Sequence, residues 1–359
     1  MNISTQHKVL VIGAGQAGLA MGWHLQRQGL DFLILEAGAQ PGGNWGNYYD
    51  SLKLFSPAAY SALPGMPFPA APEHYPRRDE VTAYLQAYAA HFQLPIRFNT
   101  RIQQVSRLDQ GFRLRSEDGQ AFQCDALVVA SGAFNQPHLP AIDGLESFNG
   151  TLLHSRDYRN SLGFAGQHVV VVGAANSAVQ IAHELAAVAE VSLASREKVR
   201  FFPQHLLGID FHAWLHWSGL EKTRWLSDQS TPVLDDGSYR RALREGRYRQ
   251  RAMFQRVEHD AVIWADGERE RIDALIFATG FRPNLDFLAD LPISDRRGQL
   301  LQRNGRALRV QGLFFVGLPK QRNFASATLR GVGPDAAHLL PALLRHLKQT
   351  RRVTVPGLI

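Results

Sequence analysis

The chain of 359 residues is long enough for two domains with separate cores, and its 45% apolar and 20% charged residues are typical of a folded globular protein. The net charge of +7 suits attraction of anionic nucleotides, but the arginines are scattered and no nucleic-acid-binding motif is present, so no nucleic acid is expected as a partner. The single cysteine, Cys124, excludes a CxxC redox pair, and neither a signal peptide nor an apolar run of about 20 residues is present, so we expect a cytoplasmic protein without a membrane span.

The first motif along the chain is a dinucleotide-binding turn. The apolar residues 9–12 predict a buried parallel strand, and the glycine-rich turn of residues 13–18 follows directly. A helix to about Gly29 and a second strand at residues 32–35 lead to Glu36, where a carboxylate accepts hydrogen bonds from a free ribose 2′-hydroxyl. The positive end of the helix faces a pyrophosphate. The expected contacts in this unit are Gly13, Gly15, Gln16, Ala17, Gly18 and Glu36.

A repeat of turn and strand occurs once in each half of the chain. Asp118-Gly119 is followed by Asp125 and then by Ser131-Gly132, and Asp266-Gly267 is followed at the same spacing by Asp273 and then by Thr279-Gly280. Each copy predicts a hairpin turn, then a buried strand that ends in small residues. Small residues at a strand end allow the backbone to pass close to a cofactor. The repeat indicates that the two halves arose by duplication.

A second dinucleotide-binding turn follows the strand at residues 168–172. Ala175 replaces its middle glycine, and the added methyl group favours a looser site for a nucleotide that enters and leaves. Arg196 occupies the position that Glu36 has in the first unit, and an arginine there suits a 2′-phosphate. The alternative is a relic without a ligand, which Arg196 opposes. The expected contacts in this unit are Gly173, Asn176, Ser177, Ser195, Arg196, Thr279 and Gly280.

Opposite charges at the two ribose positions predict two different dinucleotides in one chain. The pairing that makes chemical sense is tightly bound FAD at the first site and NADPH at the second, with NADH as an open alternative. The turn at residues 42–45 ends in a large aromatic side chain, which we expect to lie against the flavin. The further residues expected to contact FAD are Gly43, Asn44, Trp45, Ile102 and Gly132.

Residues 201–220 are rich in aromatic side chains. His212 and His216 have the spacing of a helical metal pair, but the glutamate of an HExxH motif is missing and no third ligand stands out, so we expect no metal site. An aromatic lid, a self-association surface and plain core packing remain open for this segment. Self-association through this segment would give a homodimer.

The order of the units predicts an α/β fold with two Rossmann-like dinucleotide-binding domains, the second inserted in the first. The first domain would be completed after Gly280 by a strand at residues 313–317 and a helix that starts after Gly333 and runs to about Lys348. We therefore expect a discontinuous FAD-binding domain of residues 1–155 and 280–359, and an NAD(P)H-binding domain of residues 156–279.

Between the two turns lies an FxGxxxHxxxY motif that runs from Phe148 to Tyr158. With both dinucleotide turns, the Gly-Gly-Asn-Trp turn and the Ala-Thr-Gly that ends at Gly280, it makes the chain resemble the class B flavin-dependent monooxygenases, specifically the compact bacterial flavin-containing monooxygenases. The resemblance covers nearly the whole chain. It implies that His154 lies at the domain junction without touching flavin, and a plain structural histidine there is the alternative.

The resemblance also implies a reaction. NAD(P)H passes a hydride to FAD, O₂ adds to form a C4a-(hydro)peroxyflavin, and a soft nucleophile such as a sulfide or an amine takes one oxygen atom. Baeyer–Villiger oxidation of small ketones is a further expectation. The substrate is thus a small molecule, and the protein supplies orientation and a dry site. Some compact members of the family accept NADH as well as NADPH.

One position departs from the family pattern. Larger members carry an asparagine beside the flavin, and Phe55 falls at the matching position of this chain. A phenyl ring donates no hydrogen bond, so either another group stabilises the intermediate or hydrogen peroxide leaks from the site. An uncoupled NAD(P)H oxidase is therefore one alternative function. A non-catalytic flavoprotein that serves as a redox sensor or accessory is another, although Arg196 opposes it.

Overall fold

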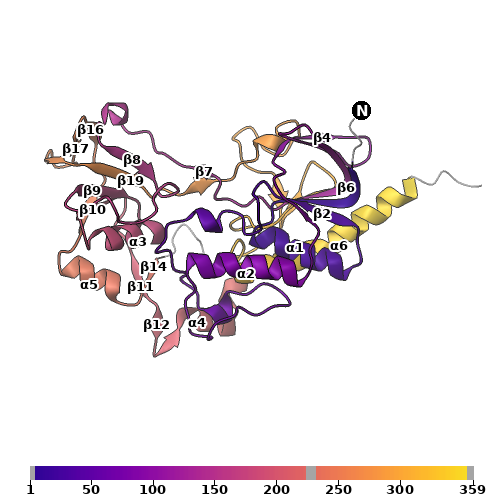
Figure 1. The fold of residues 1–359 in the computed structure, drawn as a ribbon, viewed down its shortest axis with the longest axis horizontal. Coiled ribbons are helices and arrows are strands. Elements are labelled where there is room, and N and C mark those ends of the chain that lie inside the picture. The colour runs from indigo at the N-terminus through magenta and orange to yellow at the C-terminus, as the bar shows by residue number, and fades with distance from the viewer. Residues whose placement is uncertain (1–4, 224–231, 354–359) are drawn as a thin grey trace, which may run out of the picture.

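The computed structural model describes residues 5–223 and 232–353, and their two largest sheets lie next to each other (Figure 1). Each sheet contains a parallel βαβ unit with a glycine turn between its first strand and its helix. The predicted α/β fold with two Rossmann-like units is confirmed. The final residues of the range 280–359 lie outside the described part of the chain.

The first sheet has nine strands in the order β21-β22-β23-β6-β1-β2-β3, with β5 also paired to β6 and β4 to β5. Its strands are β1 (Thr5–Ile12), β2 (Phe32–Leu35), β3 (Ile96–Arg97), β4 (Ile102–Arg107), β5 (Phe112–Ser116), β6 (Ala121–Val129), β21 (Gln302–Arg303), β22 (Arg306–Ala307) and β23 (Leu313–Phe315). Strand β1 pairs in parallel with β2 and β6. This central position explains why residues 9–12, the second half of β1, are all apolar, because both faces of the strand are buried there.

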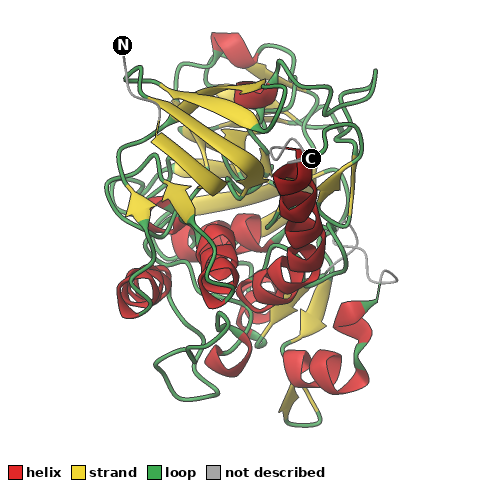
Figure 2. Cartoon of the chain, turned by 90° about the vertical axis from the view of Figure 1, so that its right-hand side faces the viewer, coloured by secondary structure: helices red, strands yellow, loops and turns green. Residues whose placement is uncertain are grey.

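Three helices cover one face of the first sheet (Figure 2): α1 (Gln16–Arg27), α2 (Arg78–His91) and α6 (Leu329–Val353). Val9 and Val11 of β1 pack in the core on this helical face. Leu10 and Ile12 point to the opposite face and pack with residues of β4, β5 and β6. The alternation follows from the two-residue period of a strand.

The second sheet has five parallel strands in the order β15-β10-β9-β19-β8. They are β8 (Thr151–His154), β9 (His168–Val172), β10 (Glu190–Ser195), β15 (Arg249–Ala252) and β19 (Ala274–Phe277). Helices α3 (Asn176–Leu185) and α5 (Ser238–Arg244) cover one face, where Val169 and Val171 are buried. The antiparallel strands β16 (Arg256–Glu258), β17 (Ala261–Ile263) and β18 (Arg269–Arg271) contribute Val257, Val262 and nearby Trp264 to the other core.

Shorter elements connect and flank the two sheets. Strands β7 (Gln136–Pro137) and β20 (Phe281–Arg282) pair in antiparallel fashion where the chain passes between the sheets (Figure 1). The remaining elements are β11 (Phe201–Pro203), β12 (His205–Leu206), β13 (Ile209–Asp210), α4 (Phe211–Ser218), β14 (Val233–Asp235) and the 3₁₀ turns η1 (Trp45–Asn47), η2 (Ala58–Tyr60), η3 (Leu145–Ser147), η4 (Leu220–Lys222) and η6 (Asp286–Leu288).

Two element boundaries differ from the sequence expectation. Strand β8 falls before the predicted domain boundary at residue 155, yet it pairs with β19 at the edge of the second sheet. Helix α6 begins at Leu329 and contains both Pro334 and Pro341, whereas the glycine and proline there favoured a start after Gly333. Burial of Val332 and Leu339 in the helical core overrides that local preference. The domain division itself stays a proposal.

The described helices include none that combines the length and the apolar character needed to cross a bilayer.

We predict that Gly18→Ala destabilises the protein by at least about 2 kcal/mol. A Cβ atom on Gly18 would lie 1.8 Å from the carbonyl oxygen of Gly13, so α1 would have to move away from β1. Thermal and urea unfolding of the purified variant measures the loss. Gly46→Ala is the matched control, because a Cβ atom there meets nothing within 4 Å. Equal stability of the two variants would contradict the packing argument.

Candidate functional site

The carboxyl ends of the parallel strands of both sheets face one cavity of about 1950 Å³. It is lined by both glycine turns and by the linker segments between the sheets. Ligands of open α/β sheets bind at this edge of the strands. The sequence-predicted residues that line the cavity are Gly13, Gly15, Gln16, Ala17, Glu36, Gly43, Asn44, Trp45, Phe55, Ile102, Gly132, Gly173, Asn176, Ser177, Ser195, Arg196, Thr279 and Gly280.

The first glycine turn allows three backbone segments to meet. Gly13 has a φ of +102°, and a Cβ atom on it would lie 2.8 Å from the carbonyl oxygen of Ala130, just after β6. The amide of Gly42 donates to the carbonyl oxygen of Ala14 over 3.0 Å, and the backbones of Gly15 and Gly43 pass close together. Only glycine fits this approach, so the turn residues of 42–45 lie directly against the start of α1.

Glu36 is buried at the edge of the cavity, and the backbone holds its carboxylate in place. One carboxylate oxygen accepts the amide N–H of Ala14 at 2.6 Å, and the other accepts that of Gly38 at 2.8 Å. Each oxygen can accept a further hydrogen bond. The carboxylate is therefore fixed and still able to accept a ribose hydroxyl.

Side-chain hydrogen bonds fix the aromatic wall of the first site. Gln16 donates from Nε2 to the carbonyl oxygen of Ala327 at 2.6 Å, and its Oε1 accepts the indole N–H of Trp45 at 3.1 Å. Asn44 donates to the Phe134 carbonyl and to Asn135 Oδ1, both at 2.8 Å. Trp45 is thus held at the cavity by Gln16 of α1. Gln16 is in turn held by the carbonyl oxygen of Ala327, in the chain before α6.

The second glycine turn repeats the first with one change. Gly173 has a φ of +151°, and a Cβ atom on it would lie 2.5 Å from the carbonyl oxygen of Ala278, just after β19. Helix α3 starts at Asn176 without a side-chain cap, so its first N–H groups are free to bind an anion at the cavity. Arg196 is exposed and follows β10 directly.

Two buried hydroxyl groups without hydrogen-bond partners indicate that the cavity suits a polar ligand such as a nucleotide. The side-chain oxygens of Ser131 and Ser195 are buried and have no hydrogen-bond partner among the described residues. Both serines line the cavity, one just after β6 and the other at the end of β10, so each sheet contributes one. A buried hydroxyl without a partner is costly unless a ligand satisfies it. Together with the two helix N-termini, Glu36 and Arg196, these residues fit two dinucleotides.

His154 lies at the junction and not on the cavity wall. Its Nδ1 accepts the N–H of Arg156 at 3.1 Å, so the neutral ring carries its proton on Nε2, which donates to the Gly280 carbonyl at 3.0 Å. Its ring also meets the edge of Phe281, with centroids 4.8 Å apart. Burial lowers the pKa of His154. The residue connects β8 to the strand end that precedes β20. Gly18 likewise does not line the cavity, because it serves the packing of α1.

Several cavity residues were missed by the sequence reasoning. Ser131 and Gly317 end predicted strands, and that position was the signal that could have identified them. Tyr49, in the loop after η1, donates a 2.8 Å hydrogen bond from its hydroxyl to Oε1 of Gln180 on α3. No local pattern marks the Tyr49–Gln180 pair, because the fold alone brings the two side chains together.

Residues 201–220 do not line the large cavity. Phe202 and Phe211 pack together with ring centroids 4.9 Å apart, while Leu207 and Trp217 are 93% and 64% exposed. In the described part of the chain, no cluster of three or more His, Cys, Asp or Glu side chains could hold a metal ion. Core packing accounts for part of the segment, and self-association of its exposed part stays a prediction.

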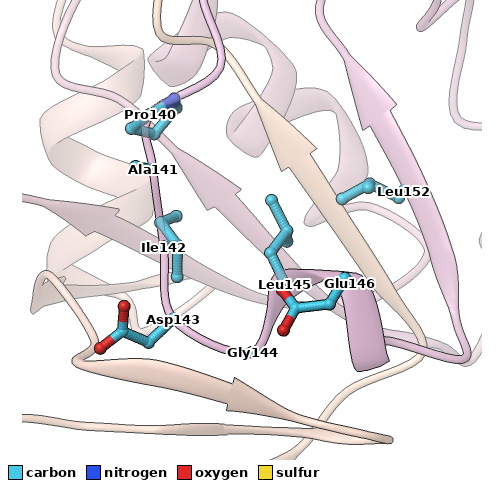
Figure 3. A pocket seen from close by; sticks show the side chains of 8 residues that line it. All are labelled: Pro140, Ala141, Ile142, Asp143, Gly144, Leu145, Glu146 and Leu152. Carbon is cyan, nitrogen blue, oxygen red and sulfur yellow. The ribbon is translucent and has the colours of Figure 1, made fainter.

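A second, more open hollow of about 700 Å³ adjoins the first at residues 140–143 (Figure 3). Ile142, Leu145 and Leu152 form its apolar part, and the carboxylates of Asp143 and Glu146 lie at its side. Nucleotide binding is assigned to the large cavity, because both glycine turns line that cavity and neither lines this hollow.

The comparisons with known proteins agree with this geometry. Residues 10–317 match the family described as pyridine nucleotide-disulphide oxidoreductase. A CzcO-like oxidoreductase of Geobacillus kaustophilus, itself uncharacterized, is 34% identical over 94% of this chain and 98% of that protein. The solved flavin-containing monooxygenase of Stenotrophomonas maltophilia is 34% identical, with a TM-score of 0.84 over 95% of this chain and 99% of that one. Indole-3-pyruvate monooxygenase YUCCA4 of Oryza sativa is 28% identical over 94% of this chain and 87% of that protein.

We predict that stability falls as the pH drops below about 6.5, in part through His154. Burial holds its pKa below the unfolded value, so the unfolded chain binds more protons and acid favours unfolding. Urea unfolding of wild type and His154→Asn at about pH 7.5 and 5.5 should show a smaller loss in the variant. The loss that remains belongs to His24, His183 and His212, whose pKa values burial also lowers.

The control for this measurement is His259→Asn, at an exposed turn residue with a φ of +42° that asparagine tolerates. It should lose as much stability as wild type. An identical loss in wild type and His154→Asn would show that His154 does not contribute.

Proposed function

Because the chain belongs to the pyridine nucleotide-disulphide oxidoreductase family, we propose that it is an NAD(P)H-dependent flavoprotein monooxygenase with FAD at the first glycine turn and NADPH at the second. The observation that carries the proposal is a single cavity lined by both turns, with the Glu36 carboxylate at one strand end and the Arg196 guanidinium at the other. The likeness to the Stenotrophomonas maltophilia flavin-containing monooxygenase supports it over nearly the whole chain.

In the first site each group has one task toward FAD. Glu36 accepts a ribose hydroxyl, and the N-terminal amides of α1 bind the pyrophosphate. Ser131 supplies the hydroxyl that has no partner within the chain. Trp45, held by Gln16, forms the aromatic wall.

In the second site the groups are matched to a phosphorylated nicotinamide nucleotide. The amides at the start of α3 bind the pyrophosphate, and Arg196 pairs with the 2′-phosphate. The Ser195 hydroxyl hydrogen-bonds the same end of the nucleotide. Arg196 is exposed. This suits a site that the nucleotide must leave after each reaction.

When bound, FAD supplies hydride acceptance from the nicotinamide and the activation of O₂ for transfer of one oxygen atom to the substrate. The protein's contribution is to bind and orient both nucleotides and to exclude water from the cavity. A dithiol step of the kind that the family description suggests needs two cysteines, and Cys124 is the only one. Its thiol is also buried, and burial raises its pKa, which suppresses the reactive thiolate.

The substrates we propose are small soft nucleophiles, sulfides and amines, with Baeyer–Villiger oxidation of small ketones as a further activity. We also propose that the enzyme works in the cytoplasm, without a nucleic acid or a membrane as partner.

An uncoupled NAD(P)H oxidase is the second candidate, and Phe55 favours it. This side chain lines the cavity and has no hydrogen-bond donor to offer. An oxygen-activating site without a donor at this position releases more hydrogen peroxide.

The test incubates the FAD-loaded protein with NADPH and a small thioether in air. The sulfoxide and the hydrogen peroxide formed are each measured per NADPH consumed. The proposal predicts sulfoxide as the main product, with hydrogen peroxide as the minor one. Hydrogen peroxide alone would establish the oxidase. A protein that consumes no NADPH in the presence of FAD would contradict both candidates.

For nucleotide choice, we predict that Arg196→Ala lowers the ratio of kcat/KM for NADPH to that for NADH by about 10-fold or more, because a charge-assisted contact to the 2′-phosphate is lost. Arg113→Ala is the matched control. It removes the same charge from an exposed position on β5 of the other sheet, and should leave the ratio unchanged. An unchanged ratio in Arg196→Ala would remove this residue from the site.

A further inference from the structure

Residues 204–222 form a bridging segment that comprises β12, β13, α4 and η4. The segment follows β11, which pairs with β14 beside the second sheet, and continues past residues of the first half of the chain (Figure 1). It contacts Phe55, Tyr60 and Tyr75 there. None of its residues lines the large cavity, but Phe55 does.

We propose that His212 of the bridging segment is a positioning residue that holds the Phe55 ring against the cavity, and that Asp210 in turn holds His212. The consequence for oxygen transfer rests on the proposed function. The position of the Phe55 ring does not depend on the proposed function and can be tested separately.

The imidazole of His212 lies near two aromatic rings. Its plane is tilted by 24° from that of Phe55, with centroids 5.9 Å apart, and by 28° from that of Tyr60, at 6.5 Å. His212 is only 1% exposed, so little space is left for it to move. Phe55 therefore both lines the cavity and stacks on a ring that has little room to move.

Asp210 fixes the orientation of His212. Its Oδ1 accepts the backbone N–H of His212 at 2.7 Å and lies 3.1 Å from Nδ1 of the ring. Its Oδ2 accepts the Tyr75 hydroxyl and, at 3.1 Å, the amide of Gln204. Burial alone would raise the pKa of Asp210, but these hydrogen bonds lower it to about 2, so the carboxylate stays charged.

The backbone of Phe55 is held by the same network. The Gln204 amide that donates to Asp210 also donates to the carbonyl oxygen of Phe55 at 3.0 Å. Both the ring and the main chain of Phe55 are thus attached to the bridging segment.

The other end of the bridging segment is attached to α6 by a separate contact. Glu221 accepts from Nε of Arg330 at 2.7 Å, and both side chains are more than nine-tenths buried. Arg330 lies in the first turn of α6. His212 therefore sits between two attachments, one at Asp210 and Tyr75 and one at Glu221 and Arg330. This fixes the ring on which Phe55 stacks.

The experiment compares His212→Ala, His212→Phe and a control, Trp217→Ala, in the FAD-loaded enzyme. Trp217 is on the same helix and 64% exposed. Loss of the stack in His212→Ala should raise both the thioether KM and the hydrogen peroxide released per NADPH by between about 2- and 10-fold. The rate of flavin reduction by NADPH should stay within about 2-fold, because the nucleotide groups are untouched. His212→Phe keeps a stacking ring but loses the ring contact with Asp210, so it should restore both values only in part.

Crystal structures of wild type and His212→Ala supply the readout that does not depend on activity. The Phe55 ring should rotate away from its wild-type position or occupy more than one. This result would support the positioning role even if the wild type proves to be an oxidase. An unmoved Phe55 ring, or kinetic values in His212→Ala equal to those in Trp217→Ala, would overturn the proposal.

Should His212→Ala fail to fold, Tyr75→Phe replaces it, since it removes one hydrogen bond to Asp210 and keeps the ring. The same displacement of Phe55 and a smaller rise in peroxide are then expected. No change in either would overturn the proposal.

Discussion

The close approach of a glycine to the neighbouring strand end is the constraint on which both sites depend. Gly13 lies against the backbone of Ala130, and Gly173 lies against that of Ala278 in the same manner. Any side chain at these positions would push the turn away from the adjacent strand. With glycine, the start of a helix and the small residues after a parallel strand come together at one edge of the sheet. The large cavity lies where two such sheet edges meet.

The difference between the sites comes from groups placed on this common frame. Glu36 is buried and held by two backbone amides, whereas Arg196 is exposed. The first arrangement suits a nucleotide that stays, and the second suits one that exchanges. Gly42 and Trp45 add a wall to the first site only, through contacts to Ala14 and Gln16. Repetition of the βαβ unit thus provides two similar sites, and a few local contacts make them unequal.

Much of this could be predicted from sequence, because the chemistry of a dinucleotide turn is local. The glycines, the helix start and the charge at the second strand end all lie within one short stretch. The fold class and the resemblance to flavin-dependent monooxygenases were therefore predicted, and both are confirmed. The domain boundaries, the individual site roles and a homodimer stay predictions. Strand β8 shows the limit of boundary prediction, since its pairing with β19 joins distant parts of the chain.

Contacts between distant segments could not be predicted in this way. The stack of Phe55 on His212, the hydrogen bond of Tyr49 to Gln180 and the ion pair of Glu221 with Arg330 each join residues far apart in sequence. No periodicity or spacing encodes these pairs. Tyr49, Phe55 and Gln180 line the cavity, so contacts of this kind shape the space for the substrate. The reaction class is therefore clearer from the sequence than the molecule on which the protein acts.

The most direct test of the central claim is anaerobic mixing of the purified, FAD-loaded protein with NADPH while the visible flavin absorbance is followed. If one cavity holds both dinucleotides in reach of each other, the absorbance bleaches and returns when air is admitted. A protein that remains colourless after incubation with FAD, or whose bound flavin is not reduced by NADPH or NADH, would contradict the account.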